Sequence, residues 1–121
     1  MRKTIRGGHI LVAFAGLALA LSACPGSMSS ENPLLHEMES PSKIVQEGCE
    51  LAYRKCTRCH TIERLMATKP SDAHAWRRYV RRMRMMPSAA IQVSEEPKIV
   101  QCLVYRDFGA KGLASLEGEA P

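Results

Sequence analysis

The sequence predicts a small all-α domain with three main helices. Three stretches space their apolar residues three or four positions apart, and no stretch shows the alternation expected of a strand. The 121 residues, 45% hydrophobic and 24% charged, suffice for one small domain and exclude a multidomain enzyme. All twelve acidic residues lie at or beyond Glu31, so the first part of the chain differs in character from the rest.

Residues 1–23 have the pattern of a signal peptide. Basic residues precede the uncharged residues 10–21, which are too few to cross a bilayer core of about 30 Å as a helix. The following Leu-Ser-Ala-Cys resembles the lipobox of bacterial lipoproteins, which implies cleavage before Cys24 and a lipid on its thiol. An ordinary secretory peptide cleaved at another small residue is the alternative.

The lipobox resemblance also predicts where the protein is located. We expect it to be exported and held by its lipid on a bacterial membrane, facing the periplasm. The outer membrane is favoured, because Pro25 replaces the aspartate that often retains such lipoproteins at the inner membrane.

The mature chain is expected to have three parts. Residues 24–41 are rich in proline and serine with few apolar side chains, which predicts a flexible tether. A folded domain over residues 42–110 follows, and residues 111–121 are expected to form a disordered tail.

The three helices are bounded by capping and breaking residues. The first spans residues 41–55, with a serine and a proline at its start. The second begins at residue 71 or 72 and ends near Pro87. The third has Ser94 as N-cap and Gly109 as a left-handed stop. Their apolar positions include Ile44, Leu51 and Ala52, then Trp76, Val80 and Met83, and finally Ile99, Cys102 and Leu103.

Residues 56–60, Cys-Thr-Arg-Cys-His, form the motif C-x-x-C-H, which is typical of covalent haem attachment. Two thiols three residues apart on a helical turn reach the two vinyl groups of one porphyrin, and the next residue's imidazole lies under the iron. So small a domain rarely gains enough stability from its own core, which favours a cofactor in the interior. We therefore expect one haem c, attached through Cys56 and Cys59, with His60 as an iron ligand.

With this motif, the sequence resembles the class I monohaem c-type cytochromes over most of residues 43–109. Gly48 lies eight residues before the first haem cysteine, where the family's first helix crosses its last. A bacterial subgroup matches more closely, with C-H-x-x-x-R at residues 59–64 and W-x-x-x-V-x-R-M at residues 76–83.

The resemblance implies both a fold and a function. The fold is class I-like, with three main helices wrapped around one covalently attached haem. The function is to carry single electrons between periplasmic or cell-surface redox partners, with the iron cycling between Fe(III) and Fe(II). The protein would then not be an enzyme, and no small-molecule substrate is expected.

The resemblance also implies a methionine as the sixth iron ligand. Met83 occupies the subgroup's methionine position, while Met86 precedes a proline, as in many ordinary cytochromes. We expect His60 and Met83 to ligate the iron, with Met86 as the alternative. A methionine sulfur stabilises Fe(II), which suits an electron carrier.

Pro70 and Trp76 have candidate supporting roles. A backbone carbonyl just before Pro70 would orient the ring of His60, although Pro70 is equally a plain turn proline. Trp76 is interpreted as the largest core side chain in preference to a donor to a haem propionate.

Two cysteines, Cys49 and Cys102, remain outside these assignments. Export permits a disulfide, and the packing of the family brings the first and last helices together near Gly48 and Cys102. The alternative is that each is a small buried hydrophobic residue, and the sequence leaves this choice open.

Positive charge is concentrated in residues 54–84, which hold ten basic residues against Glu63 and Asp72. Such a face is either simply solvated or a docking surface for acidic redox proteins, and we favour docking. Anionic lipid headgroups compete for the same face. Nucleic acid is not expected, because the protein is exported and the patch lacks stacking aromatic residues.

Three other classes of function compete with electron transfer. One is a haem-based sensor or a small peroxidase whose iron has an open distal side. Another is a structural module in which the four cysteines at positions 49, 56, 59 and 102 bind zinc or an iron–sulfur cluster. A thiol oxidoreductase is disfavoured, because no strand precedes the C-x-x-C sequence.

Overall fold

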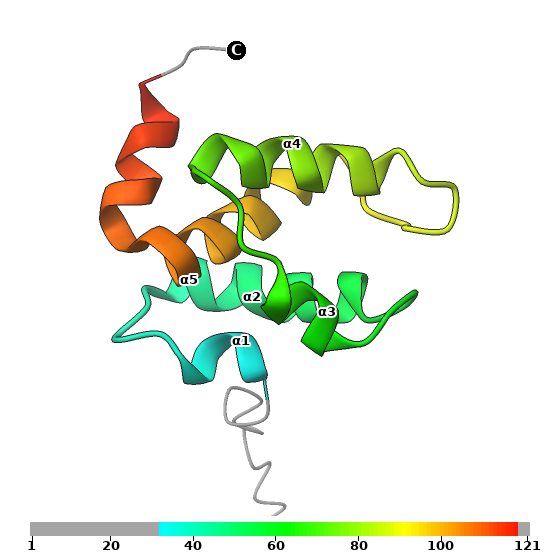
Figure 1. The fold of residues 1–121 in the computed structure, drawn as a ribbon, viewed down its shortest axis with the longest axis horizontal. Helices are drawn as coiled ribbons and strands as arrows, with labels where there is room; N and C mark the ends of the chain where they lie inside the picture. The colour runs from blue at the N-terminus through cyan, green and yellow to red at the C-terminus, as the bar shows by residue number, and fades with distance from the viewer. Residues whose placement is uncertain (1–31, 119–121) are drawn as a thin grey trace, which may run out of the picture.

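The computed structural model describes residues 32–118 and shows five helices (Figure 1). The three longer helices pack together, and this part of the chain contains no strand, which confirms the predicted all-α class with three main helices. The predicted signal peptide and Cys24 lie outside the described residues. In chain order the helices are α1 (Pro33–His36), α2 (Lys43–Cys56), α3 (Ile62–Ala67), α4 (Ala73–Arg84) and α5 (Glu96–Glu117).

Side-chain caps set the starts of α2 and α4. The Ser42 hydroxyl accepts a hydrogen bond from the Val45 amide at 3.4 Å, and the Asp72 carboxylate accepts one from the Ala75 amide at 2.7 Å. We expected the first helix to begin at residue 41, but Ser40 has a φ of 47°, which is not the extended conformation of an N-cap.

The helix α5 is longer than the sequence predicted. Its N-cap is Glu95 rather than Ser94, and its backbone breaks at Gly109, which has φ 62° and ψ −159°. This conformation is nearly exclusive to glycine. The helix nevertheless resumes and ends at Glu117, so the expected disordered tail is wrong for residues 111–117.

The last turns of α5 are ordered because they pack on the rest of the domain. Leu113 and Leu116 lie against the hydrophobic core, and Arg77 of α4 donates a hydrogen bond to the Leu116 carbonyl at 3.1 Å. The sequence alone does not reveal these partners.

The expected tether also contributes to the domain. Asn32 caps α1 by accepting a hydrogen bond from the Leu34 amide at 3.0 Å, and the side chain of Leu34 is completely buried. Tyr105 of α5 donates its hydroxyl proton to the Glu39 carbonyl at 3.0 Å. The prediction of a flexible tether is therefore wrong for residues 32–41.

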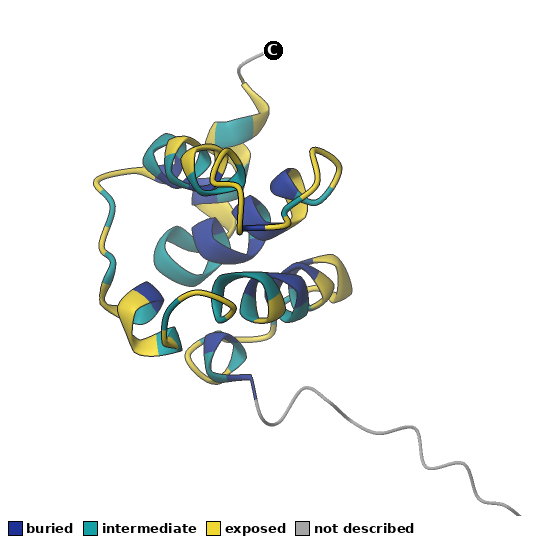
Figure 2. Ribbon diagram, turned by 90° about the vertical axis from the view of Figure 1, so that its right-hand side faces the viewer, coloured by how far each residue is buried: buried dark blue, intermediate teal, exposed yellow. Residues whose placement is uncertain are grey.

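The hydrophobic core lies between α2, α4 and α5, and their inward faces carry the buried residues (Figure 2). Trp76 of α4 is its largest fully buried side chain. The helices α2 and α5 cross at Gly48, where a Cβ atom would meet the backbone carbonyl of Lys98. A glycine is needed at this position because the two backbones approach so closely.

A disulfide between Cys49 and Cys102 joins α2 to α5 beside this crossing, with their Cα atoms 4.9 Å apart. The choice that the sequence left open is therefore decided in favour of a bridge. Both residues are completely buried, so the bond is part of the core.

Loss of this disulfide is expected to reduce the free energy of unfolding by about 2–4 kcal/mol, because the bond closes a long loop and so restricts the unfolded chain. The sequence separation of its cysteines is 53 residues. Urea unfolding of the Cys49→Ala/Cys102→Ala protein measures the effect. An unchanged transition midpoint would show that the bond does not stabilise the domain.

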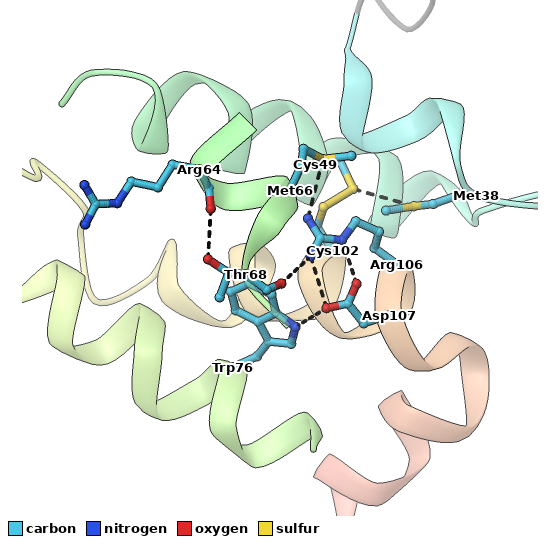
Figure 3. Close-up of polar contacts among 9 residues, drawn as sticks. All are labelled: Met38, Cys49, Arg64, Met66, Thr68, Trp76, Cys102, Arg106 and Asp107. Carbon is cyan, nitrogen blue, oxygen red and sulfur yellow. Dashed lines mark hydrogen bonds and ion pairs between the residues drawn. A yellow bond between two sulfur atoms is a disulfide. The ribbon is translucent and has the colours of Figure 1, made fainter. Parts of the chain in front are cut away.

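A polar network joins α4 and α5 at the edge of the core (Figure 3). The Arg106 guanidinium donates two hydrogen bonds to the Asp107 carboxylate, at 2.8 and 3.0 Å, and only 1% of the Arg106 side chain is exposed. Trp76 donates its indole N–H to the same carboxylate at 2.8 Å, and the guanidinium lies 5.3 Å from its ring centroid. The Thr68 carbonyl and the Met66 sulfur also face Arg106.

Candidate haem site

The C-x-x-C-H motif lies at the carboxyl end of α2. Cys56 is the last residue of that helix, and Cys59 and His60 belong to the turn that leads to α3. Within the described residues, Cys56 and Cys59 are the free cysteines, and Cys59 is exposed. The structure thus brings the three predicted attachment residues together on one turn.

The two thiols have different surroundings. Burial raises the pKa of the Cys56 thiol to about 11, because a thiolate would lose its hydration there. Cys56 also packs against the hydrophobic core. The Cys59 sulfur lies at the surface, 3.8 Å from the Ser88 hydroxyl. This contact places the C-x-x-C-H turn, residues 56–60, beside the loop that follows α4.

Lys55 holds the same loop against the end of α2. Its ammonium group donates a hydrogen bond to the Ala90 carbonyl at 2.7 Å and pairs with the Glu95 carboxylate at 2.9 Å. The pKa of Glu95 is lowered, first by a hydrogen bond from the Gln92 amide and then by Lys55. Ala90 has a φ of 49°, an uncommon conformation for a residue with a Cβ atom.

The ring of His60 is oriented by a neighbouring carbonyl. Its Nδ1 lies 3.1 Å from the Thr61 carbonyl oxygen, and since a carbonyl only accepts hydrogen bonds, Nδ1 carries the proton. The lone pair of the neutral ring is then on Nε2, the nitrogen available to a metal. Of the two interpretations of Pro70, the structure does not bear out the one in which the preceding carbonyl orients the ring, because the Thr61 carbonyl contacts Nδ1.

The candidate methionines lie at the end of α4 and in the loop beyond it. Met83 is half-buried on the last turn of the helix, whereas the side chains of Met85 and Met86 are 68% and 51% exposed. The Met86 amide donates a hydrogen bond to the Met83 carbonyl at 3.0 Å. Met86 and Ser88 share the loop that contacts Cys59, and Met83 lies on the helical turn directly before that loop, so both candidates lie near the C-x-x-C-H turn.

Trp76 is a core residue, as the sequence favoured. It is fully buried, and its N–H is already committed to Asp107, so this group is not available to a propionate.

The donor set fits a covalently attached haem. Two free thiols with the required spacing precede an imidazole whose Nε2 faces no described hydrogen-bond partner, and thioether sulfurs lie on the adjacent segment. It does not fit a site with four cysteine ligands, because Cys49 and Cys102 are bonded to each other. Among residues 32–118, no three His, Cys, Asp or Glu side chains are grouped to hold a metal ion.

Sequence reasoning missed the contacts that fix the site. Lys55, Ser88, Ala90 and Glu95 carry no motif, and their roles arise only when α2 and the loop after α4 meet. The position of Lys55 directly before Cys56 was the one local signal, because a residue on that turn must lie near the site.

The basic face predicted on α4 is partly neutralised. Arg78 and Arg82 are exposed, whereas Arg84 donates to the Glu96 carboxylate at 2.6 Å.

None of the helices in residues 32–118 combines the length and the apolar character needed to span a bilayer.

No protein-family model matches the chain, and searches of curated proteins and of solved structures find no significant match either. The function is therefore argued from the residues and their geometry.

Proposed function

We propose that this chain is a membrane-anchored monohaem c-type cytochrome that carries single electrons between periplasmic or cell-surface redox partners. The observation that carries the proposal is the turn at the end of α2, where two free thiols precede an imidazole oriented by Thr61. A class I-like fold around one haem also requires α2 and α5 to cross closely, and the contact of Gly48 with Lys98 supports this.

Each residue of the site has one task in this proposal. The bound haem supplies an iron that accepts and releases one electron. Cys56 and Cys59 attach the porphyrin through thioether bonds, so it is retained outside the cell membrane. His60 ligates the iron through Nε2, with its ring held by the Thr61 carbonyl. Met83, or alternatively Met86, would supply a sulfur ligand to the iron.

The proposed partners are acidic redox proteins, which would bind the basic surface of α4, and a membrane, which would hold the predicted lipid. The exposed Arg78 and Arg82 of α4 would attract acidic redox proteins and raise their encounter rate at low salt. Lipid on Cys24 would anchor the protein on a bacterial membrane, with the outer membrane favoured. This function requires neither a substrate nor nucleic acid.

The second candidate is a haem-based sensor or a small peroxidase, and the exposure of Met86 favours it. If neither Met83 nor Met86 reaches the iron, one side of the haem is open to a small ligand. The module with four cysteine ligands is not proposed again, because the disulfide removes two of its sulfurs.

The first test is covalent attachment of haem. Protein exported by cells that have the attachment machinery is expected to keep the mass of one haem after denaturation. The Cys56→Ser/Cys59→Ser protein should lack the added mass of haem, whereas the Cys49→Ala/Cys102→Ala protein should keep it. Intact-mass spectrometry measures all three proteins. If the unaltered protein has only the mass of the lipidated polypeptide, the proposal fails.

The second test identifies the sixth ligand. Met83→Ala is expected to abolish the weak absorption band of the oxidised protein near the red end of the spectrum, which reports methionine–iron bonding. Met86→Ala should retain the band. The control Met85→Ala should retain it as well, because the side chain of Met85 is more exposed than that of Met86. Retention of the band in Met83→Ala and its loss in Met86→Ala would assign Met86 instead. Absence of the band from the unaltered protein would favour the open-sided alternative.

A further inference from the structure

A cavity of about 430 Å³ lies between α4 and the two parts of α5, apart from residues 56–60. It exists because α5 breaks at Gly109 and its last turns bend toward α4 (Figure 1). The hydrogen bond from Arg77 to the Leu116 carbonyl holds this bend. The volume lies within the range of about 300–1,000 Å³ that is usual for small-molecule sites.

The cavity has an apolar side and a cationic side. Val100, from the first part of α5, and Leu113 and Leu116, from its last turns, form the apolar side. Arg77 and Arg81 lie one helical turn apart on α4 and form the cationic side. A ligand that satisfies both sides has an apolar body and an anionic head.

Both arginines keep donors for such a head. Glu96 accepts its short hydrogen bond from Arg84 at 2.6 Å, whereas the Nε atom of Arg81 lies 3.4 Å from the other carboxylate oxygen. The terminal nitrogens of Arg81 therefore have no partner among the described residues. Arg77 uses Nη2 for the Leu116 carbonyl, which leaves its Nη1. A planar guanidinium is well suited to a carboxylate.

The charges around the cavity set the charge of the ligand. Arg84 neutralises Glu96, so Arg77 and Arg81 face one further acid at the rim, Glu117. The net charge of Arg77, Arg81 and Glu117 together is therefore +1, which matches a monoanion better than a dianion. The amide of Gln101 also lines the cavity and has no described hydrogen bond.

We propose that this cavity binds a monocarboxylate with a medium-length aliphatic chain. Arg77 and Arg81 hold the carboxylate, and the chain lies on Val100, Leu113 and Leu116. Burial of the chain removes apolar surface from water, while the two guanidinium groups replace the water around the carboxylate. The site is separate from the proposed haem site, so binding does not depend on the redox function.

Isothermal titration of the full chain with decanoate, below its micelle concentration, tests the proposal. We expect saturable binding of one decanoate per chain. Arg77→Gln should weaken binding by at least about tenfold, since a charge-assisted hydrogen bond is lost. Arg78→Gln is the matched control, because this neighbouring arginine is 69% exposed and does not line the cavity. Its affinity should be unchanged.

A second variant separates the cavity from a diffuse cationic surface. Leu113→Trp keeps both arginines but fills the apolar side, so it should abolish decanoate binding. Far-UV circular dichroism checks that each variant is folded. If Arg77→Gln does not fold, Arg81→Gln takes its place and should weaken decanoate binding in the same way, and Leu113→Trp still tests the apolar side. Binding that survives Leu113→Trp, equal losses in Arg77→Gln and Arg78→Gln, or no saturable binding to the unaltered chain would overturn the proposal.

Discussion

Replacing Gly48 with valine is expected to destabilise the domain severely. A Cβ atom at this position would meet the carbonyl carbon and oxygen of Lys98, and both belong to the backbone of α5. No side-chain rotation relieves that clash, so α2 and α5 must separate along their crossing. We expect a loss of at least about 3 kcal/mol, a large share of the roughly 5–15 kcal/mol that stabilises a small domain.

Far-UV circular dichroism and urea unfolding measure this effect. The matched control is Gly118→Ala, because a Cβ atom there meets nothing within 4 Å. That variant should unfold at the same urea concentration as the unaltered protein. A Gly48→Val protein with an unchanged transition would show that the two helices do not cross as described.

Replacing Asp107 with alanine is expected to reduce the free energy of unfolding by about 3–5 kcal/mol, the usual cost of leaving a buried charge without its partner. The Arg106 side chain is almost completely buried and donates both of its short hydrogen bonds to this carboxylate. The indole N–H of Trp76 would lose its acceptor as well.

A double variant distinguishes the unpaired charge from a general defect. Arg106→Met/Asp107→Leu removes both charges with apolar side chains, so it should be more stable than Asp107→Ala. Glu47→Ala is the surface control, because Glu47 is mostly exposed and faces Lys43 at 4.0 Å. It should change stability by less than about 1 kcal/mol. Equal losses in Asp107→Ala and Glu47→Ala would contradict a structural role for the network.

The main helices were predictable because local signals define them. The cap Asp72 and the apolar spacing of α4 are contained within that segment, and Leu51 and Ala52 of α2 are buried as their spacing predicted. The expected cap before residue 41 was wrong, since Ser42 caps α2, and Ile44, expected among the apolar positions, is 63% exposed. The short helix α1 was not predictable, because its residues are typical of a tether until Leu34 enters the core. The prediction that α5 ends at Gly109 was wrong for a related reason. A glycine with positive φ either ends a helix or bends it, and only the packing of the following turns on α4 decides which.

The candidate site divides in the same way. The spacing of the motif at residues 56–60 predicts haem attachment from the sequence alone, and the structure places these residues on one turn at the end of α2. The contacts of Lys55 and Cys59 with the loop after α4 join segments about thirty residues or more apart, so no local pattern reveals them. The ring of His60 contacts the carbonyl of the next residue, Thr61, whereas the sequence had offered only the carbonyl before Pro70 as a candidate partner.

The bond between Cys49 and Cys102 also changes what a protease can do to this molecule. Residues 49–102, from the middle of α2 to the first part of α5, lie inside one covalent ring, which includes the C-x-x-C-H turn and the exposed residues around Met85. A single cut of the backbone anywhere within that ring opens it without releasing a fragment. The two halves remain one molecule for as long as the sulfur bridge is oxidised.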